Sequence, residues 1–190
     1  MMKIALVGNI ASGKSTVEKT LQELNFSVLD TDFVAHCLLE NNAEIMDAFK
    51  DYDILTAGKI SREKLGKIVF SDEVLKQKLE AILHPQIRAK IQEYFSIHSN
   101  EKLVFVSIPL LFEAKMEDLF DKVLFVYTND DIRLQRLMKR NNYTKEYAIV
   151  RMNSQISQDE KVKLADWVIY NNSTVEDLRK MVVNVIEQIH

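Results

Sequence analysis

A glycine-rich segment near the N-terminus has the residue types and spacing of a phosphate-binding loop. Residues 8–16 read GNIASGKST and fit the pattern G-x-x-x-x-G-K-[ST], directly after an apolar run and before a helical pattern. In this context backbone N–H groups and a helix N-terminus face a triphosphate, Lys14 neutralises its β- and γ-oxygens, and the Ser15 hydroxyl completes a Mg²⁺ shell. The residues expected to contact ATP here are Gly8, Ala11, Ser12, Gly13, Lys14, Ser15 and Thr16.

The alternative reading of this segment is an ordinary glycine turn between a strand and a helix. The chain has only four glycines, and two of them, Gly8 and Gly13, occupy the positions that the motif requires. Glycine lets a phosphate approach the backbone where a Cβ would block it. The motif and its context together therefore favour the phosphate-binding interpretation.

Two carboxylates follow the second predicted strand, as Asp30-Thr31-Asp32. Ligands of open α/β sheets bind outside the carboxyl ends of the strands, so a carboxylate here can orient an acceptor hydroxyl, take its proton or hold Mg²⁺ through water. The alternative is that Asp30 or Asp32 only caps the helix that begins near Phe33, a common use of aspartate.

A third candidate group is a row of arginines. Arg133, Arg136 and Arg140 have the spacing i, i+3 and i+7 on a predicted helix, which gives that helix one cationic face. Guanidinium groups that close over a transferring phosphoryl group neutralise its charge. The alternative is an ordinary solvated basic face, and for Arg133, which lies nearest the preceding strand, we expect that alternative to hold.

An alternation of strands and helices must position these side chains. The predicted buried strands are residues 4–8, 26–30, 103–108, 123–127 and 167–170, short apolar runs bounded by turn or cap signals. Helical patterns lie between them, which indicates an α/β fold with a parallel sheet. The long interval 33–100 contains no good strand and reads as a helical insertion.

Helix starts are indicated by capping residues. Ser61 and Ser71 are expected N-caps in the insertion, and Pro85 is expected in the first turn of a helix. Ser157 and Ser173 each precede a glutamate by three residues, which predicts a capping box on either side of the last strand.

Composition narrows the class of protein. The chain has 190 residues, of which 47% are hydrophobic, enough for one compact domain spanning 1–190. A formal net charge of −3 argues against a nucleic-acid partner. The single cysteine, Cys37, excludes an internal disulfide framework and is expected in the core. Without a signal peptide or a run of about 18 apolar residues, we expect a cytoplasmic protein with no membrane partner.

With those residues placed, the sequence resembles the dephospho-coenzyme A (dephospho-CoA) kinase family over nearly its whole length. The resemblance depends on motifs that occur in order along the chain. They are GNIASGKST at 8–16, LDTD at 29–32, LHPQI at 83–87, PLLFE at 109–113, QRLMKR at 135–140, RMNSQ at 151–155 and ADWVIYNN at 165–172. The histidine–proline and PLLFE elements discriminate best, because a phosphate loop alone is common to many activities.

The resemblance implies a three-layer P-loop kinase core with a five-stranded parallel sheet, a helical acceptor-binding insertion at about 33–100 and a helical lid at about 130–158. It implies transfer of phosphate from ATP, with Mg²⁺, to the ribose 3′-hydroxyl of dephospho-CoA, the last step of coenzyme A biosynthesis. The expected partners are these small molecules, and the expected state is a monomer or weak oligomer.

The resemblance also implies roles for single residues. Asp32 would be the acceptor-orienting base, Lys14 and Ser15 the phosphate and magnesium groups, and Arg136 and Arg140 lid residues close to the phosphates. The remaining implied contacts are His84, Pro109, Leu110 and Leu111 on the acceptor side and Asn171 near the ATP adenine. Taken singly, the HisPro element could instead cap a helix, residues 109–112 could face the core, and Asn171 could belong to a plain turn.

The sequence departs from the family pattern in the loop and in the sheet. Asn9 and Ala11 stand where the family commonly has glycine, and Ser107 stands where many phosphate-loop proteins have an acidic residue at a strand end. Two other functions remain open: another small-metabolite or nucleoside kinase, and a nucleotide-dependent switch. A GTP switch usually carries Asn-Lys-x-Asp, whereas residues 128–131 read TNDD and lack the lysine.

Overall fold

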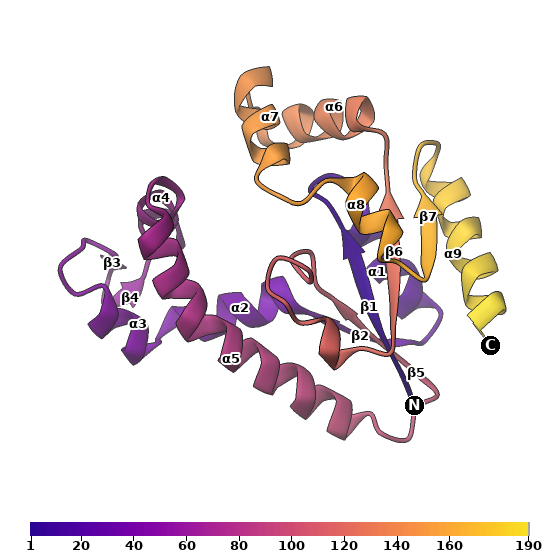
Figure 1. Ribbon diagram of the computed structural model, residues 1–190, viewed down its shortest axis with the longest axis horizontal. Coiled ribbons are helices and arrows are strands. Elements are labelled where there is room, and N and C mark those ends of the chain that lie inside the picture. Colours follow the sequence, from indigo (N-terminus) through magenta and orange to yellow (C-terminus); the bar gives the residue numbers. More distant parts are fainter. Residues whose placement is uncertain (190) are drawn as a thin grey trace. The chain divides into compact units, whose positions relative to one another are not determined.

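A parallel β-sheet is the central element of the fold. In the computed structural model, which describes residues 1–189, five strands lie in the order β2-β5-β1-β6-β7 (Figure 1). β1 pairs in parallel with β5 and β6, and β6 pairs in parallel with β7. The strands are β1 (Met2–Gly8), β2 (Ser27–Asp30), β5 (Leu103–Ser107), β6 (Lys122–Tyr127) and β7 (Trp167–Tyr170). The predicted α/β fold and all five predicted strands are confirmed, with strand ends shifted by at most two residues.

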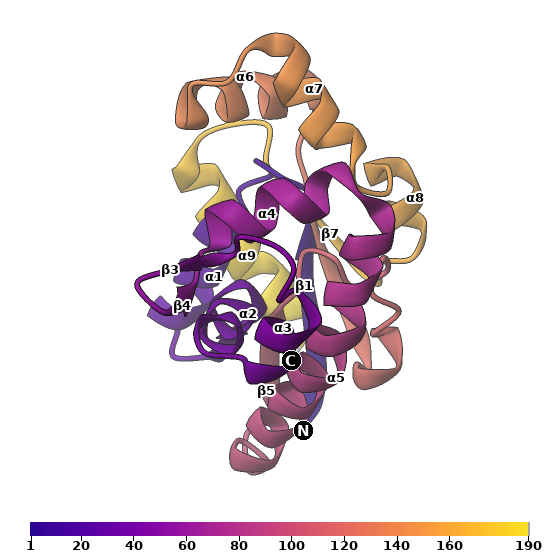
Figure 2. The same cartoon turned by 90° about the vertical axis from the view of Figure 1, so that its left-hand side faces the viewer.

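Helices cover both faces of this sheet. α1 (Lys14–Glu23) and α9 (Val175–Ile189) contact each other on one face, and α8 (Gln158–Lys163) lies on the other (Figures 1 and 2). The apolar residues of α1 and α9 recur at helical spacing and pack against alternate strand residues. That core contains Ile4, Leu6, Val17, Leu21, Leu103, Phe105, Leu124, Val126, Ile169, Leu178, Val182 and Ile186. Each such side chain contributes about 1.5–3 kcal/mol on full burial.

The segment between β6 and β7 is helical and contains the predicted lid. It consists of α6 (Asp130–Asn141), α7 (Lys145–Asn153) and α8, and α6 and α7 lie side by side (Figure 2). The Ser157 hydroxyl accepts a hydrogen bond from the Glu160 N–H, which confirms the helix start predicted for α8, while the Glu160 carboxylate accepts from the Ser157 hydroxyl. At α9 the prediction is wrong by one residue, because the Thr174 hydroxyl, and not Ser173, accepts from an N–H of the first turn, that of Asp177.

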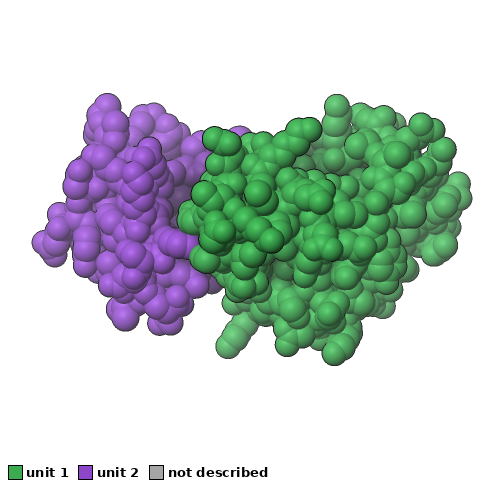
Figure 3. All heavy atoms as spheres, turned by 90° about the horizontal axis from the view of Figure 1, so that it is seen from above, with its two compact units in different colours: residues 1–29, 95–190 green, residues 30–94 purple. Residues whose placement is uncertain are grey.

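The chain divides into two compact units, residues 1–29 together with the chain from 95 onward, and residues 30–94 (Figure 3). The elements of the second unit are α2 (Thr31–Glu40), α3 (Ala43–Ala48), β3 (Leu55–Thr56), β4 (Lys59–Ile60), α4 (Arg62–Ser71) and most of α5 (Glu73–Ile97). It has an apolar core of its own, formed by Ile45, Phe49, Ile54, Ile60, Leu65 and Leu83. The unit is helical as predicted, except for the short antiparallel pair β3-β4.

Of the two N-caps expected in this second unit, one is confirmed and one fails. Ser61 accepts a hydrogen bond from the Lys64 N–H, as an N-cap should. Ser71 instead ends α4, and the carboxylate of Asp72 accepts from the first N–H groups of α5. The prediction for Ser71 is wrong because the stronger cap follows it directly.

Pro85 and Cys37 also differ from expectation. Pro85 lies in the interior of α5 and not in a first turn. A proline there removes one intrahelical hydrogen bond, and apolar packing of its neighbours Leu83 and Ile87 keeps the helix continuous. Cys37 is exposed and not in the core, because its neighbours Leu38 and Leu39 occupy the face of α2 that packs inward.

Among residues 1–189, no helix is long and apolar enough to cross a membrane.

Candidate active site

The phosphate loop joins the carboxyl end of β1 to the start of α1, as the motif predicts. Gly13 has a φ of 94°, and a Cβ built there would lie 2.1 Å from Nδ2 of Asn171. Ala11 also has a left-handed φ, of 63°, which costs a residue with a Cβ on the order of 1 kcal/mol. Gly13 is therefore required by both conformation and space, whereas Ala11 holds the loop in a mildly strained conformation.

The carbonyl oxygen of Ser12 anchors the loop to the next two strands. It accepts a hydrogen bond of 2.7 Å from Nδ2 of Asn171 and one of 2.8 Å from the Thr128 hydroxyl. Both donors are buried and follow directly after β7 and β6. The Asn171 amide, expected near the adenine, thus supports the loop backbone. Sequence reasoning did not identify Thr128, whose only signal is its position at the end of a strand beside β1.

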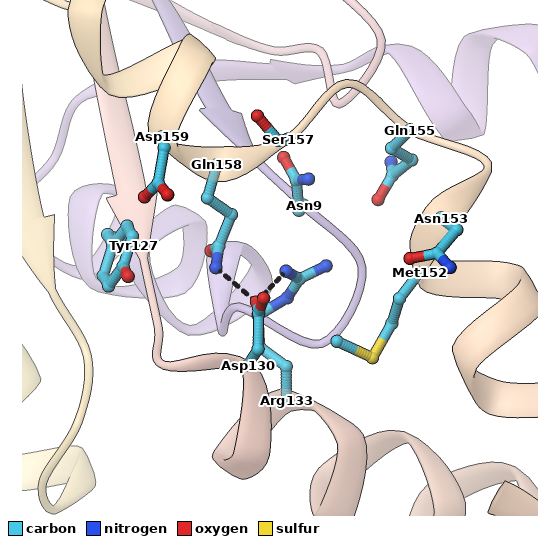
Figure 4. A pocket seen from close by; sticks show the side chains of 10 residues that line it. All are labelled: Asn9, Tyr127, Asp130, Arg133, Met152, Asn153, Gln155, Ser157, Gln158 and Asp159. Carbon is cyan, nitrogen blue, oxygen red and sulfur yellow. Dashed lines mark hydrogen bonds and ion pairs between the residues drawn. The ribbon is translucent and has the colours of Figure 1, made fainter.

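A second set of hydrogen bonds joins the loop to the two ends of the lid segment. The Ile10 N–H donates to Oε1 of Gln155 over 2.7 Å, and Nδ2 of Asn9 donates to the Ile156 carbonyl over 2.9 Å. The Arg133 Nε donates to the Ile10 carbonyl over 3.0 Å. Asn9, which replaces a glycine of the family pattern, therefore uses its side chain and needs no positive φ. Asn9, Arg133 and Gln155 are among the residues that line a cavity of about 340 Å³ (Figure 4).

The expectation that Arg133 belongs to a solvated basic face is wrong. Its side chain is buried, with 2% of the residue exposed, and Nη1 lies 2.7 Å from Oδ1 of Asp130. Burial lowers the pKa of the guanidinium and Asp130 opposes that effect. Because the first turn of α6 lies against the phosphate loop, its first arginine faces inward. Arg136 is partly exposed, and Arg140 is exposed and donates from Nε to Oδ1 of Asn141.

Lys14 contacts a carboxylate one helical turn away. Its Nζ lies 2.7 Å from Oε1 of Glu18 and also donates to the Ser107 hydroxyl, which in turn donates to Glu18. Ser15 is exposed in the first turn of α1. Among residues 1–189, no cluster of three or more His, Cys, Asp or Glu side chains could hold a metal ion. The Ser15 hydroxyl is an oxygen donor that fits Mg²⁺ when nucleotide phosphates supply other ligands.

The PLLFE segment after β5 is held by a buried ion pair. Lys161 is fully buried, and its Nζ lies 2.8 Å from Oε1 of Glu113, which also accepts from the Ile156 N–H. Burial lowers the pKa of Lys161 and Glu113 opposes it. Leu111 is buried and Leu110 is exposed, so consecutive residues of the motif point in different directions.

Asp32 and His84 belong to the second unit. Asp32 is exposed in the first turn of α2, and its N–H donates to Oδ1 of Asp30 over 2.8 Å. The helix cap is therefore Asp30 and not Asp32, which removes the capping interpretation for Asp32. His84 is half-buried in the interior of α5, which excludes the N-cap alternative for it.

Comparison with known proteins decides the family. The sequence model described as dephospho-CoA kinase matches residues 2–177. The chain belongs to the dephospho-CoA kinase family. A curated dephospho-CoA kinase of Listeria monocytogenes is 42% identical over 192 residues, covering 97% of this chain and 96% of the relative.

Solved structures agree with membership in the dephospho-CoA kinase family. The dephospho-CoA kinase of Campylobacter jejuni superposes with a TM-score of 0.77 at 37% identity, covering 98% of this chain and 96% of the other. A Thermus thermophilus crystal structure gives a TM-score of 0.87 at 34% identity, covering 100% and 98%. The family resemblance inferred from the ordered motifs is confirmed.

Proposed function

We propose that this protein transfers the γ-phosphoryl group of ATP to the ribose 3′-hydroxyl of dephospho-CoA, which gives coenzyme A and ADP. The observation that carries the proposal is the phosphate loop at the carboxyl end of β1, in a chain whose family match spans residues 2–177. Such loops bind a triphosphate through backbone N–H groups at a helix N-terminus. The reaction would complete coenzyme A biosynthesis in the cytoplasm.

The phosphate groups would be held by the loop and by Lys14. A phosphoryl-transfer transition state spreads charge over the equatorial oxygens, and the Lys14 ammonium neutralises part of it. The Ser15 hydroxyl would be the protein ligand for Mg²⁺, which would supply positive charge to the phosphate groups. The contacts of Thr128 and Asn171 with the Ser12 carbonyl keep the loop in the required conformation.

The acceptor would be bound by the insertion at about 33–100 and covered by the lid at about 130–158, within one kinase domain. Asp32 would orient the 3′-hydroxyl and accept its proton as the oxygen–phosphorus bond forms and the bond to ADP breaks. His84, Pro109, Leu110 and Leu111 would contact the acceptor. Arg136 and Arg140 would approach the phosphates from the lid, and Arg133 would hold the loop backbone.

A coupled assay for ADP tests the proposal. The purified protein is incubated with ATP and Mg²⁺, alone, with dephospho-CoA and with a panel of nucleosides and small hydroxyl metabolites. We expect ADP and coenzyme A to form in equal amounts only with dephospho-CoA. A different preferred acceptor would indicate another metabolite kinase, and acceptor-independent hydrolysis would indicate a nucleotide switch.

Lys14→Ala tests the role of the phosphate loop in that assay, with Lys19→Ala as its matched control. Removing one electrostatic group from a transfer site typically costs about 100- to 1000-fold in turnover. Lys19→Ala, on the same helix but exposed, should leave turnover unchanged. A folded Lys14→Ala protein with near-normal turnover would overturn the assignment of the phosphate loop.

A further inference from the structure

The end of β5 lacks the acidic residue that phosphate-loop enzymes commonly place there. In P-loop NTPases an aspartate at such a strand end helps hold the phosphate-bound Mg²⁺. β5 is the neighbour of β1, and its last residue is Ser107, paired in register with Leu6. Ser107 is fully buried and carries no charge. Any negative group near the end of β5 therefore comes from another element of the fold.

The carboxylate of Glu18 lies at that place. Oε1 of Glu18 accepts hydrogen bonds from the Ser107 hydroxyl and from Nζ of Lys14, the latter over 2.7 Å. Glu18 comes from α1, one turn after Lys14, so a helix that follows the phosphate loop brings the charge to the end of a strand 89 residues further along.

An ordinary surface pair at i and i+4 does not account for this arrangement. The side chains of Lys14 and Glu18 are only 13% and 14% exposed, and both contact Ser107. The pair of Lys19 and Glu23 on the same helix has the same spacing, but its side chains are 71% and 46% exposed. Charges that are largely removed from water need defined partners, and here each of them has one.

The geometry also leaves Lys14 able to bind phosphate. A lysine ammonium has three N–H donors. Among residues 1–189, two of them are accounted for by Glu18 and Ser107, and the third remains for a phosphate oxygen. A carboxylate that holds the ammonium in this way fixes its position before the nucleotide arrives, which reduces the reorganisation that catalysis requires.

We propose that Glu18 supplies the negative charge that is missing from the end of β5. Together with the Ser107 hydroxyl, its carboxylate positions the Lys14 ammonium that receives the nucleotide phosphates. Glu18 is thus a positioning residue, and the inference rests on the proposed binding of a nucleotide at this loop. It would be specific to a chain that carries serine, and not an acidic residue, at position 107.

The test uses Glu18→Gln, which keeps size and a hydrogen-bond acceptor but removes the charge. Loss of an outer partner that orients a metal-binding side chain typically costs about 10- to 100-fold. Because Glu18 orients Lys14 in a comparable way, we expect a loss of that size in kcat/KM for ATP. Titration calorimetry with ATP, in the presence and absence of Mg²⁺ and without acceptor, should show weaker binding in both conditions. Glu23→Gln is the matched control and should change neither quantity.

The decisive variant moves the charge. Ser107→Asp restores a carboxylate at the strand end, and adding it to Glu18→Gln should recover most of the lost kcat/KM and ATP affinity. Melting curves of all variants separate a loss of folding from a loss of positioning. Should the double variant not fold, the kinetics and ATP affinity of Glu18→Gln alone decide.

Three results would overturn the inference. They are a Glu18→Gln protein that matches Glu23→Gln in both readouts, one that binds ATP more tightly than the parent protein, and a folded double variant that recovers nothing. Failure of the proposed function is a distinct result, since the parent protein would then show no turnover with dephospho-CoA while the ATP affinities still report on Glu18.

Discussion

The backbone N–H of Ile10 donates a 2.7 Å hydrogen bond to Oε1 of Gln155, which joins the phosphate loop directly to the segment after α7. The neighbouring bonds from Asn9 to the Ile156 carbonyl and from Arg133 to the Ile10 carbonyl join the same loop to both ends of the lid segment. The conformation of the loop is therefore coupled by polar contacts to the position of α6 and of the segment after α7.

We expect Gln155→Ala to lower the free energy of unfolding by about 1–3 kcal/mol, because it leaves the Ile10 N–H without its acceptor. Gln155→Glu keeps an acceptor at the same position and should restore most of that stability. Its added negative charge should weaken ATP binding. Urea denaturation and titration calorimetry measure the two effects, and equal stability of the Ala and parent proteins would show that this bond contributes nothing.

Asp32→Asn should reduce turnover by roughly 100- to 10,000-fold, the range of a lost general base, with ATP affinity nearly unchanged. Asp30→Asn is the control, because Asp30 is the helix cap and asparagine caps about as well as aspartate. Steady-state kinetics beside melting curves check both variants. An Asp32→Asn enzyme within about threefold of the parent, a loss far smaller than that range, would place the base elsewhere.

Arg136→Ala and Arg140→Ala should lower kcat more than they raise KM for dephospho-CoA. A group used mainly in the transition state lowers kcat, whereas one used equally in ground and transition states raises KM. Lys139→Ala, exposed on the same helix, controls for the loss of one positive charge. A change confined to KM would make these arginines substrate-binding groups.

The stability of the protein should fall in acid partly through Asp166. Partial burial raises the pKa of this carboxyl, but hydrogen bonds from Lys122 and from the Val123 N–H outweigh burial and hold the pKa below its usual 3.8. A group with a lowered folded-state pKa stabilises the fold above its unfolded-state pKa, and the contribution disappears as pH falls through the folded-state value.

Asp166→Asn should therefore destabilise the protein at neutral pH and make its melting temperature less dependent on pH below about 3.8, the ordinary carboxyl value. Thermal unfolding between neutral pH and pH 2, side by side with the parent protein, measures this. If the melting temperatures of the two proteins changed with pH in the same way across the whole range, the role assigned to Asp166 would be contradicted.

Local patterns were sufficient for the strands and for the phosphate loop. Each strand is a continuous apolar run because both faces of the sheet are covered, and Gly8, Gly13 and Lys14 are close in sequence, so spacing alone indicates their chemistry. The ordered motifs were sufficient for the family. The catalytic roles of Asp32, Arg136 and Arg140 remain predictions that the experiments above address.

Contacts between distant segments could not be predicted in this way. Arg133 looks like its neighbours on a basic helix, yet it is buried because the start of α6 lies against the Ile10 carbonyl. Pro85 looks like a helix start, yet it lies inside α5 because the apolar packing of that helix outweighs one missing hydrogen bond.

The sequence by itself determined which segment binds phosphate, which runs form the sheet and which family the chain resembles, because these depend on residues close together along the chain. Only the tertiary structure decided that Glu18 meets Ser107, that Asn171 and Thr128 hold the Ser12 carbonyl, and that Lys161 pairs with Glu113. Such pairs form when the sheet brings strand ends together, and burial then makes each polar group depend on a partner that is remote in sequence.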